Sequence, residues 1–256
     1  MELYIFLKFL TFYLYTLKLM KFKLFSFDYW DTIVPIDAEK VENMRKERAF
    51  YLSKVFKEWG YEINSDLIKY ISHEIWEIYK SYDETKEITL KKIVSDILLS
   101  LKIEIDDERV EKVVKIYEDF LIKAGFNISE GIADFLKKAK SKNKKIIIIS
   151  NTPGANVERE ILKENKIFDF FDAFYFSCEV GIRKPHPEIF ERAINDFNIL
   201  KSEVVHIGDR PELDIVGAKN AGIFSIYYNP KGYKYPDNFP KPDFEIKNFE
   251  ELERFL

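Results

Sequence analysis

Short apolar runs alternate with amphipathic stretches along most of this chain. Each run is as short as one β-strand, and four consecutive isoleucines, Ile146–Ile149, are typical of a strand that is buried on both faces. Helical periods separate the runs, and this alternation predicts an α/β fold with a doubly wound parallel sheet. The predicted strands lie just before Asp28 and at 146–152, 173–177, 204–208, 224–228 and 244–246, and the predicted helices between them lie near 128–145, 156–164, 188–197, 212–221 and 250–255.

A long helical segment follows the first strand, at residues 36–124, and it contains no clear strand. Asp37 is a typical N-cap for its first helix, and Gly60 is a typical helix stop. We therefore predict an all-helical domain at 36–124, inserted between two parts of the α/β core at 20–35 and 125–256. The four helices predicted in it run from Asp37 to Gly60, from near Ser65, from Thr89 and from just after Asp106.

The composition is that of a folded globular protein. Among 256 residues, 46% are hydrophobic and 33% are charged, which separates the chain from disordered proteins. The net charge of −4 and the lack of a basic block predict no nucleic-acid partner. Cys178 is the single cysteine, so no intrachain disulfide can form, and this fits a reducing cytoplasm. We therefore expect a cytoplasmic location, whereas the sequence does not indicate the oligomeric state.

Residues 1–19 form an apolar extension that has three interpretations. The segment Leu3–Leu17 is interrupted by Lys8, so it is short for a transmembrane helix and carries a charge in its middle. It also lacks the small-residue cleavage site of a signal peptide. The extension is a loose segment before a start at Met20, a helix packed on the domain, or a membrane anchor, and membrane contact is the least favoured of the three.

Chemically reactive side chains follow four of the predicted strands. Because the carboxyl ends of parallel strands meet at one edge of a sheet, these side chains should converge there, where ligands bind. A lysine neutralises a phosphate oxygen, carboxylates with open positions suit Mg²⁺, and a carboxylate nucleophile divides phosphoryl transfer into two easier steps. The sequence thus predicts phosphate chemistry with Mg²⁺. The side chains are Asp28, Ser150, Asn151, Lys184, Asp209 and Asp214.

Four of these side chains also have a purely structural interpretation. Asp28 would then form a turn after its strand, and Ser150 would cap a helix. Lys184 would be an exposed loop lysine, and Asp214 would be an acid in the first turn of a helix. His206 is assigned no role. The convergence of all four strand ends favours a site over these separate interpretations.

Four motifs occur in order at suitable spacing: FDYWDTIV, IIIISNT, RKPHPEIF and HIGDRPELDIVGAKNAG. In these motifs the chain resembles the haloacid dehalogenase-like (HAD) superfamily of hydrolases, in the group with a helical cap. The resemblance covers the chain from about Phe22 to its end. It implies a Rossmann-like core, with residues 36–124 as the cap that closes over a small phosphorylated metabolite.

The resemblance also implies roles for residues of the first three motifs. Asp28 would be the nucleophile that forms an aspartyl-phosphate. Thr32 and Ser150 would hydrogen-bond the phosphoryl oxygens, with Asn151 beside them. Lys184 would balance the charge of the nucleophile and the phosphate.

A Mg²⁺ site is implied in the same way. Asp28, Asp209 and Asp214 would supply carboxylate oxygens, and Trp30 would supply its backbone carbonyl. The resemblance thus assigns Mg²⁺ as the cofactor and the first and fourth motifs as its ligands.

Trp30 is a departure from the family pattern. Phosphatases of the family carry a second aspartate at this position, which protonates the leaving alcohol and then deprotonates the attacking water. A tryptophan cannot do either, and the loss of such a group typically costs ~10² to 10⁴ in rate. Asp31 follows directly, and its loop could turn it inward as a substitute acid and base.

Three functions follow from this pattern. The first is a Mg²⁺-dependent hydrolase of small phosphate esters, slow or unusual because of Trp30. The second is a metal-independent, dehalogenase-like hydrolase, since dehalogenases of the family have an aromatic residue at the position of Trp30. The third is a protein that binds phosphate or a metabolite but has lost turnover. The sequence does not name the substrate.

Overall fold

The computed structural model of the chain describes residues 22–81 and 86–256. The predictions for residues 1–19 therefore lie outside the described residues. In the described part of the chain, no helix combines the length and the apolar content that crossing a bilayer requires.

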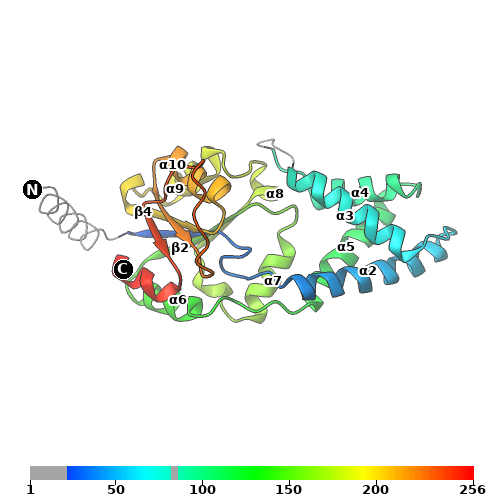
Figure 1. The fold of residues 1–256 in the computed structure, drawn as a ribbon, viewed down its shortest axis with the longest axis horizontal. Helices are drawn as coiled ribbons and strands as arrows, with labels where there is room; N and C mark the ends of the chain where they lie inside the picture. The colour runs from blue at the N-terminus through cyan, green and yellow to red at the C-terminus, as the bar shows by residue number, and fades with distance from the viewer. Residues whose placement is uncertain (1–21, 82–85) are drawn as a thin grey trace, which may run out of the picture.

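A parallel sheet of six strands, in the order β3-β2-β1-β4-β5-β6, lies at the centre of the α/β part (Figure 1). Strand β1 lies between β2 and β4, and Phe27 is level with Ile148 on one side and Ile207 on the other. The predicted doubly wound parallel sheet is confirmed. Its strands are β1 (Leu24–Phe27), β2 (Lys145–Ser150), β3 (Ala173–Phe176), β4 (Val204–Gly208), β5 (Phe224–Tyr228) and β6 (Phe244–Ile246).

The alternation of side chains along the strands builds two separate cores. Ile146 and Ile148 belong to the core that contains Phe135, whereas Ile147 and Ile149 belong to the core on the other face. Both faces are buried because helices cover both, which explains the uninterrupted isoleucine run. One face is covered by α6 (Ile132–Ser141) and α7 (Asn156–Glu164), the other by α9 (Pro187–Phe197) and α10 (Val216–Ala221).

Four helices follow β1 and pack around a third core, which includes Leu52, Val94 and Val113. Two polar side chains start helices as predicted: Asp37 accepts backbone N–H groups at the start of α2, and Thr89 does so for α4. We call α2–α5 the helical segment; it extends from one end of the α/β part (Figure 1). Its helices are α2 (Ala38–Glu58), α3 (Ser65–Ser81), α4 (Leu90–Ser100) and α5 (Asp107–Lys123).

Two predicted helices differ from the observed ones. The stretch predicted as one helix at 212–221 begins as a π-helix, η3 (Pro211–Ile215), which continues as α10. π-helical turns are rare in proteins, and those that occur are often found at functional sites. This one contains Asp214. The last helix is a 3₁₀-helix, η4 (Phe249–Phe255), and the short helix α8 (Ser177–Val180) and the short turn η1 (Phe168–Phe170) were not predicted.

A close contact between α10 and α9 gives a test of this packing. A Cβ atom on Gly217 would lie 2.6 Å from Cε2 of Phe190 and 3.3 Å from the Cα of Pro185. An alanine normally improves a helix interior by about 1 kcal/mol. Here Gly217→Ala should instead lower the free energy of unfolding by about 1–3 kcal/mol, because the buried ring has to move.

Urea denaturation measures this change. Gly154→Ala is the control, because its Cβ would meet Leu90 at an ordinary 3.5 Å. An unchanged or higher unfolding free energy for Gly217→Ala would contradict the described contact between α9 and α10.

Candidate active site

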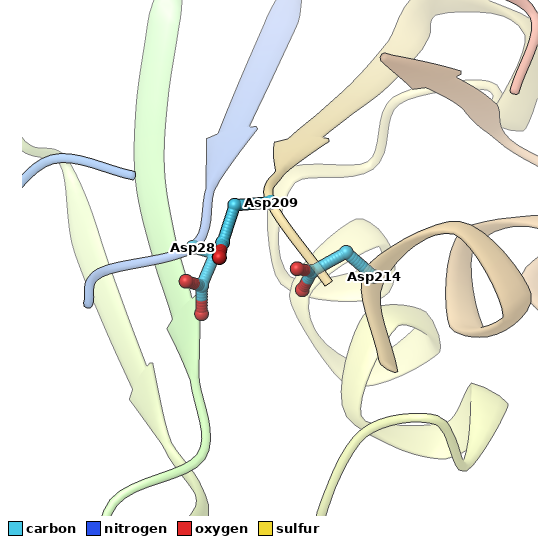
Figure 2. A group of neighbouring side chains, drawn as sticks. All are labelled: Asp28, Asp209 and Asp214. Carbon is cyan, nitrogen blue, oxygen red and sulfur yellow. The ribbon is translucent and has the colours of Figure 1, made fainter. Parts of the chain in front are cut away.

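Three carboxylates converge beyond the carboxyl ends of two neighbouring strands. Asp28 follows β1, Asp209 follows β4, and Asp214 lies in η3 (Figure 2). One oxygen of each lies within 4.8 Å of one oxygen of each of the others. The parallel register of β1 and β4 produces this, because it places both strand ends side by side.

Gly208 permits the close approach of Asp214. A Cβ atom at Gly208 would lie 2.2 Å from Cγ of Asp214, so no other residue fits at this strand end. The Asp214 carboxylate also accepts the backbone N–H of Arg210 at 2.8 Å through Oδ2. Asp214 is therefore fixed by the π-turn and is not a solvent-exposed acid of a helix terminus.

Lys184 lies between two of the carboxylates and is only 2% exposed. Its Nζ is 2.5 Å from Oδ1 of Asp28 and 2.6 Å from Oδ1 of Asp214. Burial alone would lower the pKa of Lys184, but the charges of Asp214 and Asp28 outweigh burial and raise that pKa. The interpretation of Lys184 as an exposed loop lysine is wrong.

One lysine cannot compensate three carboxylates. The pKa of one of them is therefore lowered, and the pKa values of the other two are raised. Burial would raise the pKa of Asp214, but Lys184 and His206 hold it well below its ordinary range. Burial raises the pKa of Asp28 to about 6 despite Lys184. Burial and the charge of Asp28 raise the pKa of Asp209 to about 8. We assign the firm negative charge to Asp214, because it accepts hydrogen bonds from the most donors.

The donor set fits a divalent cation. Hard cations prefer carboxylate oxygens, and Asp28, Asp209 and Asp214 offer them around one point. Burial and the neighbouring acids raise the pKa values of Asp28 and Asp209, so two free carboxylate charges are unfavourable here without a proton or a cation beside them. A cation here would supply that compensation.

The second motif lies beside this group. Ser150 ends β2, is 1% exposed, and its hydroxyl has no hydrogen-bond partner among the described residues. Helix α7 begins only at Asn156 with Ala155 as its N-cap, so the helix-cap interpretation of Ser150 is wrong.

Asn151 binds the backbone of Lys184 at both ends of its amide: Nδ2 donates to the carbonyl at 2.9 Å, and Oδ1 accepts the N–H at 2.8 Å. Asn151 thereby holds the loop that carries the lysine.

The first motif places Thr32 and Asp31 differently. The Thr32 hydroxyl is buried and donates to Oδ1 of Asp209 at 3.4 Å. Asp31 is exposed and has a φ of 57°, and its Oδ1 accepts the N–H of Ile36 at 2.9 Å. In this structure the Asp31 carboxylate is therefore hydrogen-bonded within its own loop.

His206 connects the site to the middle of the sheet and was assigned no role from the sequence. Its Nε2 is 3.2 Å from Oδ1 of Asp214, and its Nδ1 is 2.9 Å from the hydroxyl of Ser26 on the neighbouring strand. Burial lowers the pKa of His206. A neutral ring must donate from Nε2 to the charged Asp214, so Nδ1 accepts from Ser26.

Trp30 is anchored by a buried acid that the sequence analysis missed. Its indole Nε1 donates to Oε1 of Glu158 at 3.1 Å, and the Thr152 hydroxyl donates to the same oxygen at 2.6 Å. Oε2 of Glu158 is buried without a partner among the described residues. Burial raises the pKa of Glu158 to about 7. The available signal was a charged residue on the apolar face of α7.

Comparison with known proteins identifies the same family as the sequence motifs. A model of the haloacid dehalogenase-like hydrolases matches residues 22–222. A glyceraldehyde 3-phosphate phosphatase of Pyrococcus furiosus is 37% identical over 81 residues, which make up 32% of this chain and 31% of that protein. The first curated relatives are matched over 31–50% of their own length.

Two solved structures show the same fold. A 2-haloacid dehalogenase from Pseudomonas syringae aligns with a TM-score of 0.70 at 21% identity, over 91% of this chain and 97% of that chain. A HAD phosphatase from Thermococcus onnurineus aligns with a TM-score of 0.61 at 21% identity, over 92% and 97%. At this identity the likeness concerns the fold alone.

The raised pKa of Glu158 predicts a pH dependence of stability. The folded state holds the Glu158 proton up to about pH 7, whereas an unfolded glutamate releases it near 4.5. The folded protein therefore binds more protons in this window, and its unfolding free energy should fall as the pH rises through it. Glu158→Gln should remove up to about 3 kcal/mol of that fall.

Urea denaturation between pH 5 and pH 8 measures the difference between parent and variant. Glu160→Gln, a half-exposed acid of the same helix, is the control and should follow the parent. If Glu158→Gln has the same pH slope as the parent, Glu158 ionises normally and the description of a buried neutral acid fails.

Proposed function

Because the chain belongs to the haloacid dehalogenase-like hydrolases, we propose that it is a Mg²⁺-dependent phosphohydrolase of small phosphate monoesters. The observation that carries this proposal is the placement of Lys184 between Asp28 and Asp214, with Asp209 beside them. A nucleophilic carboxylate, a fixed cation and an oxygen-donor set for a metal are the parts that phosphoryl transfer needs. The matched phosphatases of the family support the same class of reaction.

Asp28 is the proposed nucleophile. One of its oxygens attacks phosphorus, the bond from phosphorus to the leaving oxygen breaks, and an aspartyl-phosphate forms. Water then attacks that phosphorus, which returns the Asp28 carboxylate and releases phosphate. Lys184 keeps Asp28 ionised and neutralises phosphoryl charge, and the hydroxyls of Thr32 and Ser150 hold the phosphoryl oxygens.

Asp28, Asp209 and Asp214, together with the carbonyl of Trp30, are the proposed ligands of Mg²⁺. When bound, the ion supplies positive charge that offsets the phosphate and the carboxylates. Asp214 also accepts hydrogen bonds from His206 and Lys184, which fixes its orientation toward this position.

The leaving-group side of the site is proposed to lack an acid. Trp30 occupies the position of the usual second aspartate. Its one polar side-chain group, the indole N–H, donates a hydrogen bond to Glu158. Asp31 is held by Ile36 at the loop surface. Substrates whose leaving group needs no proton, such as aryl and acyl phosphates, should therefore react faster than alkyl phosphates.

Residues 36–124 are proposed to form the cap over this site. The contacts between the helical segment and the α/β part include two hydrogen bonds: the N–H of Leu90 donates to the carbonyl of Pro153 at 2.8 Å, and Nδ2 of Asn156 donates to Glu118 at 3.1 Å. A cap that is inserted after β1 and touches the loop after β2 can exclude water from the strand ends.

A metal-independent hydrolase of the dehalogenase type is the second candidate. Trp30 favours it, since a halide leaving group needs no proton. The clustering of Asp209 and Asp214 with Asp28 argues against it, because so much negative charge suits a cation and not an approaching carboxylate substrate. Loss of turnover with retained phosphate binding is the third candidate.

The nucleophile and the metal can be tested together. Asp28→Asn should lower the hydrolysis of an aryl phosphate by about 10³-fold or more, since the attacking carboxylate is gone. The parent should lose activity in a chelator and regain it with Mg²⁺. The measurement is release of the phenolate, with Asp134→Asn, an exposed acid in α6, as the control.

Full activity of Asp28→Asn would refute the nucleophile. Activity of the parent on a 2-haloacid in a chelator would support the dehalogenase-type reaction instead. Binding of beryllium fluoride by a parent that turns over none of these compounds would identify the third candidate.

The role of Trp30 predicts a change of preference. Trp30→Asp should raise kcat/KM for alkyl phosphates more than for aryl phosphates, by up to ~10²-fold, because it restores one acid and base. Trp30→Phe is the matched control, since it removes the bond to Glu158 without adding an acid. Thermal unfolding of each variant accounts for the lost indole.

Asp31→Asn completes this comparison. If the parent hydrolyses both classes equally and Asp31→Asn alone abolishes alkyl turnover, then Asp31 is the acid. The interpretation of Trp30 as a gap in the acid–base machinery would then be wrong.

A further inference from the structure

Arg48 is a buried cation in the middle of the helical segment. It lies on α2 in the same apolar stripe as Met44 and Leu52 and is only 4% exposed. Its guanidinium carbon lies 3.8 Å from the ring centre of Tyr117 on α5, and its Nη1 approaches Sδ of Met44 at 3.6 Å. These are its only polar or ring contacts among the described residues, so no acid of that part of the chain compensates it.

This arrangement leaves a buried charge without a counterion. The desolvation of an ion costs several times more than one cation–π contact and one weak contact to sulfur return. Burial accordingly lowers the pKa of Arg48, and the neighbouring Arg45 lowers it further. Proteins normally pair such a charge, so an anion is missing from the described contacts.

The other buried arginine of the described residues shows the contrast. Arg183 also stacks on a tyrosine of the helical segment, Tyr79, at 4.6 Å. Unlike Arg48, it has a carboxylate close by, since its Nε lies 3.7 Å from Oε2 of the buried Glu87, although its buried Nη1 has no hydrogen-bond partner among the described residues. Of the two buried guanidinium groups among the described residues, that of Arg183 has a carboxylate beside it and that of Arg48 has none.

A small hollow between α2 and α3, which lie side by side in Figure 1, leads to Arg48. It has room for about one water-sized group, and none of its lining residues belongs to the site around Asp28. Lys69, at its edge, is paired with Glu42 at 2.8 Å, whereas Arg45 has no acid within ion-pair distance among the described residues. The polar residues and the indole that line the hollow are Arg45, Arg48, Lys69, Ser72, His73 and Trp76.

We propose that this hollow is a binding site for an oxyanion, which places one oxygen of a phosphate or carboxylate group against Arg48 while Arg45 holds the rest at the mouth. The size of the hollow fits one terminal oxygen and not a whole metabolite. The guanidinium has free N–H donors for it, because only Nη1 is engaged. The proposal is independent of catalysis at Asp28.

Arg48→Met tests the site, because methionine has similar length, carries no charge and suits the contacts with Met44 and Tyr117. In buffer without oxyanions the thermal midpoint of Arg48→Met should exceed that of the parent, since an uncompensated buried charge is removed. Lys46→Met is the control: Lys46 is an exposed lysine of the same helix, and this variant should match the parent. A lower midpoint for Arg48→Met would mean that the arginine is a structural part of the core, and the proposal would fail.

Binding is measured with inorganic phosphate in a metal-free buffer with a chelator. Trp76 lines the hollow, so its emission reports the site in the full chain that carries Trp30→Phe and Trp59→Phe. We expect a saturable change that Arg48→Met weakens by about tenfold or more and that Lys46→Met leaves in place. An equal titration with acetate distinguishes a phosphate site from one that accepts any oxyanion.

Two outcomes of this titration would overturn the proposal. One is a response that NaCl of the same ionic strength reproduces, which would make it general screening. The other is a phosphate response that is absent in the parent or identical in Arg48→Met.

Discussion

The ammonium group of Lys184, buried between Asp28 and Asp214, is the interaction on which the site depends. Three carboxylates meet in a place that is closed to most of the solvent, and each would be protonated there without compensation. Lys184 supplies one positive charge. The surrounding fold is arranged to keep that charge in place: Asn151 holds the backbone of the lysine at both ends.

The same requirement explains the details of the fourth strand and its turn. Asp214 can reach Lys184 because the strand ends in Gly208 and because a π-turn replaces the first turn of the helix. His206 adds a donor from within the sheet, and its other nitrogen is satisfied by Ser26. A glycine, a π-turn and a buried histidine thus have one common cause, which is the placement of one carboxylate.

Compensation of buried charge also links the two parts of the chain. Glu87, between α3 and α4, accepts the hydroxyl of Ser177 and lies beside Arg183, the neighbour of Lys184. The loop that carries the lysine is therefore in contact with the helical segment. Arg48 is the exception: its charge is buried, and no acid among the described residues compensates it.

The sequence by itself determined the order of elements and the residues of the strand ends. Apolar runs, caps such as Asp37 and the four motifs are local signals, and a parallel sheet brings its strand ends to one edge whatever the details of packing. Only the tertiary structure decided what the charged residues within apolar stripes do. Glu158 and Arg48 look alike in sequence, each a charge on the buried face of a helix. Glu158 faces donors from two other segments, whereas Arg48 faces a tyrosine ring and a hollow, because contacts between distant segments depend on how the helices pack and not on local periodicity.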